Sequence, residues 1–411
     1  MTLAVLLAVM SMESHGGVAD QITNLALELP KYGVQPAVVV RNPLSLGHVY
    51  AAMLREAGIR FEAIQYRRYK QIYDVCQILV QVALPLAIVD ALLRRKTLAA
   101  SRRTIWSVLR RLGYAGLDLV FFLRLLRHRV WRGVRLVHFR KPDAWSWIAK
   151  ARKLGMATIY TEDTIPQEHT RKYYEGLNCV ESSIDAVTAV SSASAKELES
   201  YLPMHRPIPV IPNLVVVNAS SSQLKEREGH HRFVVASIAR LSPEKDIETL
   251  LSAAHHASKQ NHHLLFKVFG DGPLRVSSQC LAHELELDSY VEFCGAFDKT
   301  DLPAIMDEID VVVLSTHYEG FGVALAEGMA FGKPVVATAV GGVMDVVADG
   351  VTGILVPEGD ADALAIGILT LSLDPRLYTN MALAARERYL ARFTPERVVP
   401  QYVALYERLA K

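Results

Sequence analysis

The sequence has little cysteine. The four cysteines among 411 residues, Cys76, Cys179, Cys280 and Cys294, form no C-x-x-C pair and have no histidines at metal-ligand spacing. This pattern excludes a disulfide-stapled scaffold and a cysteine-based zinc site. We therefore expect the cysteines to be buried as small hydrophobic side chains, in a protein of the reducing cytosol.

Long apolar runs are also missing. The longest, residues 78–89, is interrupted by Gln81 and Pro85, and a membrane-spanning helix needs ~20 residues. The apolar stretch 2–10 is preceded by no Lys or Arg and followed by no A-x-A-like site, which argues against a secretory signal. The sequence therefore predicts no membrane span and a cytoplasmic protein.

The composition excludes two broad classes of protein. Hydrophobic residues make up 51% and charged residues 21%, and the mean hydropathy is +0.17, too apolar for a disordered chain. The net charge of only +2 does not describe a nucleic-acid binder with a uniformly basic face. At about 100–200 residues per domain, the length predicts two domains, or three.

Positive charge is concentrated in one segment. Between Arg67 and Lys141 there are 17 Lys and Arg residues against three Asp, with Leu, Val, Phe and Trp between them. This segment predicts a basic helical insertion at about 66–133 whose surface, over 66–141, lies peripherally on an anionic membrane. The alternative is that the arginines merely solvate helices.

Strand and helix patterns alternate along most of the chain. A polar, low-complexity stretch at 213–232 reads as a connection, so we expect a domain boundary near residue 212. The alternation predicts an α/β fold with two doubly wound domains. The strands expected are Leu3–Val9, Ala37–Val40, Leu136–Phe139, Ala157–Tyr160, Ala186–Val190, Phe233–Ile238, Leu264–Phe269, Tyr290–Phe293, Val311–Leu314, Pro334–Ala337 and Gly353–Val356.

Three short motifs follow expected strands. Gly16 and Gly17 stand between the first strand and the first helix, where backbone N–H groups can approach an anion; a tight turn is the alternative. Arg240 and Lys245 follow the strand that ends at Ile238, and two cations there suit a diphosphate, although a surface ion pair would also explain them. The turn 269–273 allows a planar base to lie close to the backbone, or is a plain turn.

The most specific signal is the stretch 317–330, HYEGFGVALAEGMA. Glu319 lies in the loop after a strand, Gly320 and Gly322 lead into a helix, and Glu327 lies within that helix. The glycines free backbone N–H groups for a phosphate, and each carboxylate can accept hydrogen bonds from sugar hydroxyls. A Gly341-Gly342 pair follows.

These residues resemble glycosyltransferase family 4, the group 1 glycosyl transferases, which are retaining enzymes of the GT-B fold. The resemblance covers nearly the whole second half and is thinner in the first. It implies two Rossmann-like domains that face a cleft and a C-terminal helix that crosses back to the N-terminal domain. The domains expected are 1–212 on the acceptor side, 213–392 for the nucleotide-sugar donor, and a returning helix at 393–411.

The resemblance also implies roles for individual residues. Arg240 and Lys245 would hold the donor diphosphate and stabilise developing charge, and Glu319 would contact the transferred sugar. Glu327 would contact the ribose. The remaining donor-binding residues implied are Gly16, Gly17, Gly270, Asp271, Phe321, Gly322 and Val323.

Cofactors and acceptor contacts follow from the same resemblance. The family generally needs no metal, and the one D-x-D, at Asp360 and Asp362, reads as a helix N-cap. Many members carry a histidine where this sequence has Asp163. The possible acceptor or sugar contacts are therefore His15, Asp163 and His169.

The function expected is transfer of a sugar from a UDP- or GDP-sugar to a lipid-linked or polysaccharide acceptor, in cell-surface polysaccharide biosynthesis at the cytoplasmic face of the membrane. Two alternatives remain open. One is a catalytically silent GT-B protein that senses nucleotide sugars or assists assembly, and the other is a sugar-nucleotide epimerase. No nucleic-acid partner is expected.

Overall fold

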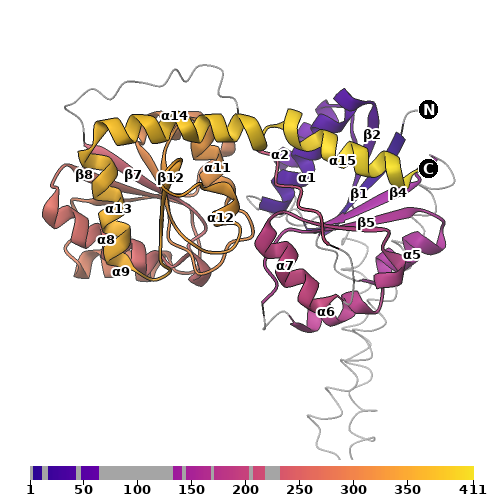
Figure 1. The fold of residues 1–411 in the computed structure, drawn as a ribbon, viewed down its shortest axis with the longest axis horizontal. Coiled ribbons are helices and arrows are strands. Elements are labelled where there is room, and N and C mark those ends of the chain that lie inside the picture. Colours follow the sequence, from indigo (N-terminus) through magenta and orange to yellow (C-terminus); the bar gives the residue numbers. More distant parts are fainter. Residues whose placement is uncertain are drawn as a thin grey trace, which may run out of the picture. The chain divides into compact units, whose positions relative to one another are not determined.

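The computed structural model describes residues 3–11, 17–42, 48–63, 133–140, 145–167, 171–202, 207–217 and 232–411. The chain divides into two compact units. Unit 1 comprises 1–161, 175–187 and 403–411, and unit 2 comprises 162–174 and 188–402. Both ends of the chain therefore belong to unit 1 (Figure 1).

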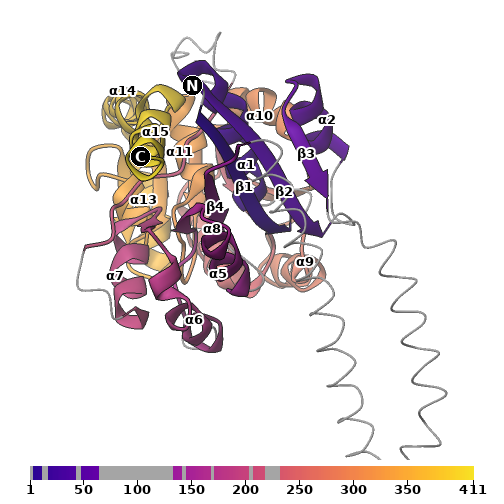
Figure 2. The same ribbon diagram turned by 90° about the vertical axis from the view of Figure 1, so that its right-hand side faces the viewer.

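The first sheet has six parallel strands in the order β3-β2-β1-β4-β5-β6, and β1 lies between β2 and β4 (Figure 2). Its strands are β1 (Leu3–Ser11), β2 (Val34–Asn42), β3 (Arg60–Ala63), β4 (Leu136–Arg140), β5 (Ala157–Glu162) and β6 (Ala186–Ala189). The helices along this part of the chain are α1 (Gly17–Glu28), η1 (Leu29–Tyr32), α2 (His48–Glu56), α5 (Ser146–Lys153), α6 (Arg171–Asn178), η3 (Glu181–Ser183) and α7 (Ser192–Tyr201).

The second sheet lies in unit 2 and has the order β12-β11-β10-β7-β8-β9. Its strands are β7 (Phe233–Ile238), β8 (Leu264–Phe269), β9 (Val291–Gly295), β10 (Val311–Leu314), β11 (Val335–Thr338) and β12 (Gly353–Val356). The helices of this part are η4 (Pro243–Lys245), α8 (Ile247–Gln260), α9 (Arg275–Glu284), η5 (Lys299–Asp301), α10 (Leu302–Glu308), α11 (Val323–Ala330), α12 (Val343–Val346), α13 (Ala361–Leu373), α14 (Pro375–Arg392) and α15 (Pro395–Leu409).

Both sheets have the same strand order when each is numbered from its own first strand. The order reverses between β1 and β4 in the first sheet and between β7 and β10 in the second. In doubly wound sheets, ligands bind outside the carboxyl ends of the strands at such a reversal. The loops that follow β7 and β10 are therefore the place to look for a site in unit 2.

Alternate residues of the second sheet pack into two separate cores. Phe233 and Val235 of β7 face α8 and α13, whereas Ala236 and Ile238 pack with α10, α11 and α14 on the other face. Figure 1 shows α8 and α13 on one side of this sheet and α11 and α14 on the other. Helices cover both faces, so the strands are apolar almost throughout, as expected of a parallel sheet.

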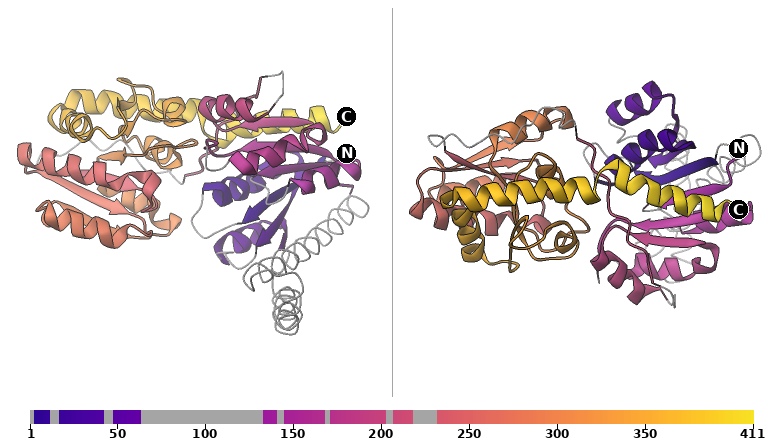
Figure 3. Two further views of the ribbon diagram at one scale, coloured as in Figure 1. Left: turned by 90° about the horizontal axis from the view of Figure 1, so that it is seen from below. Right: turned by 45° about the horizontal axis from the view of Figure 1, so that its top comes forward.

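The two last helices, α14 and α15, follow each other with a break at Phe393 and Thr394 (Figure 3). The end of α15, from Val403 onward, belongs to unit 1. There Tyr406 lies 2.7 Å from His138 Nδ1 of β4. The predicted return of the C-terminal helix to the N-terminal part of the chain is confirmed.

The two doubly wound sheets expected from the sequence are also confirmed, and four strands of the second sheet, β7, β8, β10 and β12, have the predicted bounds. The boundary near residue 212 stays a prediction. The basic insertion at 66–133 lies outside the described residues, and so does nearly all of the surface predicted over 66–141. Within the part of the chain that the structure describes, no helix is both long and apolar enough to cross a membrane.

The prediction of buried cysteines is wrong for the three that are described. Cys179, Cys280 and Cys294 are free thiols and exposed. Cys280 lies on the outer face of α9, and Cys294 lies on β9, the edge strand of its sheet. Their burial depends on which face of an element meets the core, and scattered single cysteines carry no periodicity that would indicate it.

Candidate functional site

The loop after β7 carries Arg240 and Lys245, and hydrogen bonds fix its conformation. Asp246 has a left-handed backbone (φ 45°), and its side chain caps α8 by accepting a hydrogen bond from the Thr249 N–H (3.3 Å). The Ser315 hydroxyl, just after β10, donates to the carbonyls of Lys245 (3.3 Å) and Asp246 (2.9 Å). A non-glycine residue at positive φ persists only where its surroundings hold it, so the position of Lys245 is well determined.

Lys245 and Glu319 form an ion pair. The ammonium of Lys245 lies 2.5 Å from Glu319 Oε2, and the two side chains are 19% and 20% exposed. The pair joins the loop after β7 to the loop after β10, across the reversal of strand order. Partial burial limits screening by solvent and salt. The structure therefore brings together the two residues for which the family resemblance implies contacts with the diphosphate and with the sugar.

Glu244, beside Lys245, is held in the same loop. Partial burial acts to raise the pKa of Glu244, but a hydrogen bond from Ser242, backbone hydrogen bonding and the charges of Lys245 and Arg240 outweigh it, so that the pKa is lowered. The Glu244 carbonyl accepts hydrogen bonds from the loop after β10, at the His317 N–H (2.9 Å). Glu244 is thus ionised and helps to join the two loops.

Glycines let the backbones around Glu319 approach closely. A side chain at Gly320 would collide with the Asp163 carbonyl, and one at Gly342 would collide with the Gly320 carbonyl. The Gly342 N–H donates to the Glu319 carbonyl at 2.8 Å. The predicted contact residue Asp163 therefore does lie against the Glu319 loop, through its backbone.

Helix α11 begins directly after this loop, with Gly322 as its N-cap at a φ of 91°. The Phe321 N–H lies 3.4 Å from Glu319 Oε1. Phe321, Gly322 and Val323, the predicted phosphate contacts, therefore make up the loop end and the first residue of the helix. Backbone N–H groups at a helix start attract anions.

Glu327, one turn into α11, is buried and paired. Its side chain is 8% exposed, and its Oε1 accepts a hydrogen bond from Lys299 Nζ at 2.7 Å. Lys299 lies in η5, in the connection that follows β9. Our sequence reasoning missed Lys299; the available signal was a lysine shortly after a parallel strand, the same setting that pointed to Lys245.

The predicted base-binding turn adjoins the Arg240 loop. Gly270 has a φ of 125°, and a side chain there would collide with the Ala239 carbonyl. The Leu241 N–H donates to the Asp271 carbonyl at 3.0 Å. Arg240 is therefore flanked on both sides by residues that contact the turn, so the structure brings Arg240, Gly270 and Asp271 into one region.

The predicted contacts in the first half are less completely placed. Gly17 is the first residue of α1, in unit 1. His15, Gly16 and His169 lie outside the described residues.

The D-x-D sequence serves as predicted in capping a helix. Asp360 accepts a hydrogen bond from the Ala363 N–H at 2.8 Å at the start of α13, and Asp362 lies 2.6 Å from His256. Across the described ranges, no group of three or more His, Cys, Asp or Glu side chains could hold a metal ion.

The arrangement of elements defines the class of fold. Two parallel six-stranded sheets of identical order, with a last helix that returns to the first unit, form the GT-B fold. HepE from Anabaena, solved in complex with UDP and glucose, matches with a TM-score of 0.69 over 99% of this chain and 100% of its own, at 18% identity.

Residues 221–388 match the family described as Glycosyl transferases group 1. N-acetyl-alpha-D-glucosaminyl L-malate synthase of Bacillus anthracis is 29% identical over 229 residues, which are 54% of this chain and 59% of that protein. The amylovoran biosynthesis glycosyltransferase AmsK of Erwinia amylovora is 30% identical over 194 residues, 46% of this chain and 48% of that protein. The match thus spans about half to three fifths of these relatives.

Proposed function

We propose that this protein is a retaining glycosyltransferase that moves a sugar from a UDP- or GDP-sugar to a lipid-linked or polysaccharide acceptor. The observation that carries the proposal is the Lys245–Glu319 pair at the strand-order reversal, next to the start of α11. It puts a cation, a carboxylate and a set of backbone N–H groups at one place. A nucleotide sugar needs all three, for its phosphates and for its hydroxyl groups.

The chemistry follows from the charge that develops during transfer. As the bond between the sugar and the diphosphate breaks, the sugar becomes oxocarbenium-like and the nucleoside diphosphate gains negative charge. Lys245, Arg240 and the start of α11 stabilise the departing phosphates because their charges and dipoles are already oriented. Glu319 accepts hydrogen bonds from the sugar, and Glu327 accepts them from the ribose.

The comparisons support the substrate classes. AmsK is named for amylovoran biosynthesis, and HepE was solved with UDP and glucose. We extend these to our protein as a UDP-sugar donor and an acceptor in cell-surface polysaccharide assembly. No step of the proposal uses a metal ion.

The test is release of nucleoside diphosphate from a panel of UDP-, GDP- and ADP-sugars, with and without a membrane lipid extract. We expect release from one donor, stimulated by the extract. Glu319→Gln should lower turnover about 100-fold, the size of loss typical when one preorganised polar group is removed from an active site. NMR of the product should show that the configuration at the anomeric carbon is retained.

Glu308→Gln is the matched control. Glu308 pairs with Lys267 at 2.7 Å in the same unit and is 60% exposed, so its loss should leave turnover unchanged. Nucleotide binding without turnover, or equal turnover by wild type and Glu319→Gln, would contradict the proposal. Release that is independent of any acceptor would favour an epimerase-like reaction instead.

The proposed membrane contact has its own test. The segment 66–141 carries the excess of Lys and Arg, so the protein should sediment with vesicles that contain an anionic lipid at low salt and remain free at high salt. Vesicles of a zwitterionic lipid are the control. Indifference to both kinds of vesicle would remove the membrane from the proposal and leave the transfer reaction untouched.

A further inference from the structure

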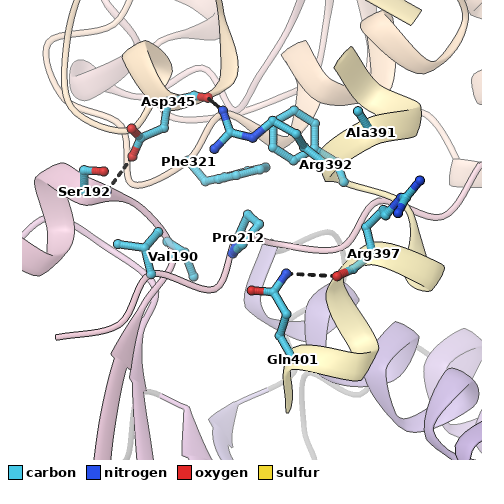
Figure 4. A pocket seen from close by; sticks show the side chains of 11 residues that line it. Val190, Ser192, Pro212, Phe321, Asp345, Ala391, Arg392, Arg397 and Gln401 are labelled. Carbon is cyan, nitrogen blue, oxygen red and sulfur yellow. Dashed lines mark hydrogen bonds between the residues drawn. The ribbon is translucent and has the colours of Figure 1, made fainter. Parts of the chain in front are cut away.

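Unit 2 contains a pocket of about 440 Å³ that is lined in part by Phe321, two residues beyond Glu319. Its lining includes Val190, Pro212, Phe321, Asp345 and Arg392 (Figure 4). Phe393 lines it as well. None of the residues that we assigned to the donor, except Phe321, reaches it. The pocket therefore adjoins the proposed site through one aromatic side chain.

Phe321 packs edge-on against Phe393. The ring centroids are 5.4 Å apart and the ring planes are at 89°, which is the favourable edge-to-face geometry for two aromatic rings. The two residues are only 2% and 1% exposed. Because Phe321 lies two residues beyond Glu319 and directly before Gly322, the position of its ring determines the path of the loop.

Phe393 is itself fixed by its surroundings. It follows α14, and its carbonyl accepts a hydrogen bond from the Val215 N–H at 2.8 Å. The hydroxyl of Tyr389, one turn earlier, donates to the Val215 carbonyl at 3.0 Å, and burial raises the pKa of Tyr389 to about 12. The guanidinium of Arg392 lies 5.6 Å from the centre of the Phe393 ring. These contacts therefore fix the position of Phe393 at the break between α14 and α15.

We infer that Phe393 is a positioning residue for the proposed transfer reaction. It holds Phe321, and Phe321 holds Glu319 and the start of α11 where the donor needs them. The inference rests on the proposed function for the role of Glu319. The pocket explains why the contact matters: both rings line it, so without the Phe393 ring the Phe321 side chain has open space into which it can turn.

The test compares Phe393→Leu, Phe321→Leu and the double variant. We expect each single variant to lose at least 10-fold in kcat/KM for the donor. Because Phe393 acts through Phe321, the double variant should be no worse than Phe321→Leu alone, which is the signature of coupled residues. Phe393→Tyr keeps the ring and its edge-to-face contact with Phe321, so it should retain more activity than Phe393→Leu.

A structural control separates positioning from stability. Phe233 is also fully buried in unit 2 and packs on Tyr378 with ring centroids 6.1 Å apart. Phe233→Leu should lower the melting temperature as Phe393→Leu does, with kcat/KM unchanged below that temperature. Phe393→Met serves as a milder second variant if Phe393→Leu does not fold.

Hydrogen exchange gives a readout that needs no turnover. The amides of 319–323 should exchange faster in Phe393→Leu than in wild type, and at the wild-type rate in Phe233→Leu. Unchanged exchange, or additive losses in the double variant, would overturn the inference while leaving the proposed function in place. An inactive wild type would instead count against the proposed function, and the exchange result would still decide whether Phe393 holds the loop.

Discussion

Lys245, Glu319, Lys299 and Glu327 show how single side chains are arranged at this site. They form two ion pairs, of 2.5 and 2.7 Å, and in both the glutamate comes from the loop after β10 or from α11. Each glutamate is thereby held in one orientation. A carboxylate that is held before the substrate arrives loses less entropy when it binds.

The second pair leads to a prediction for Lys299. Substitution of Lys299 by Ala removes this cation from the carboxylate of Glu327, whose side chain is only 8% exposed. We expect KM for the donor to rise about 5- to 10-fold, equivalent to about 1 kcal/mol, while kcat changes little. Steady-state kinetics with the ribonucleoside donor and with its 2′-deoxy analogue measures the effect.

The deoxy analogue supplies the control. If Lys299 acts through a contact between Glu327 and the ribose, wild type and Lys299→Ala should differ much less on the deoxy donor. An equal loss on both donors would place the action of Lys299 elsewhere. A KM that does not change at all would refute the role.

At this scale the sequence singled out most of the residues that the structure brings together around the Glu319 loop. A short spacing to an expected strand or to a glycine identified four of these residues: Glu319, Glu327, Arg240 and Lys245. The sequence does not show that Lys245 pairs with Glu319, 74 residues away. The pairing depends on β7 and β10 being neighbours in the sheet. Lys299 was missed although it carries the same local signal as Lys245, a lysine shortly after a parallel strand, and its pairing with Glu327 also depends on the tertiary structure.

Helix α11 begins directly after the Glu319 loop and contains Val323 and Glu327 of the candidate site. It is only eight residues long and is buried over most of its length, from Leu325 to Ala330. Its packing on β10 is close at Gly328, where a Cβ would lie 2.6 Å from Val312 Cγ2. The small residue is therefore required by the approach of the helix to the strand.

Gly328→Ala should accordingly destabilise unit 2, by about 1–3 kcal/mol, the usual cost of overpacking. This outweighs the intrinsic preference of a helix for alanine over glycine, about 1 kcal/mol. Val312→Ala removes the colliding methyl groups, so the double variant should lose less stability than the sum of the single variants. Denaturant unfolding measures all three; additive losses would show that the methyl contact is not the cause.

On the scale of the whole molecule, the first unit joins segments that are far apart in the chain. His138 of β4 lies 2.7 Å from the Tyr406 hydroxyl of α15 and 2.6 Å from Thr161 Oγ1 of β5. It is completely buried. Burial, and to a lesser extent the charge of Arg140, lower the pKa of His138 well below its ordinary value of 6.5.

This predicts a loss of stability in acid. Below pH 6.5 the unfolded chain takes up a proton at His138 that the folded chain excludes, so the free energy of unfolding falls as the pH falls. The contribution is complete above about pH 7 and decreases by up to about 1.4 kcal/mol per pH unit until the folded pKa is reached. Melting temperatures between pH 7.5 and 5 should show this decline.

His138→Gln should flatten that decline, because the titrating group is gone, although the variant is less stable at neutral pH. His283→Gln is the control, since His283 is 80% exposed beside Asp288 and should keep the wild-type pH dependence. Parallel pH profiles for wild type and His138→Gln would rule out His138 as the cause.

The sequence by itself determined the alternation of strands and helices, the bounds of β7, β8, β10 and β12, the cap at Asp360 and the position of the Glu319 motif. These features are local, since periodicity, capping and glycine spacing act within a few residues. Only the tertiary structure decided the exposure of Cys179, Cys280 and Cys294, the two ion pairs and the contact of Phe321 with Phe393. Each of these depends on which elements are neighbours in space, and residues far apart in the chain become neighbours only when the sheets form.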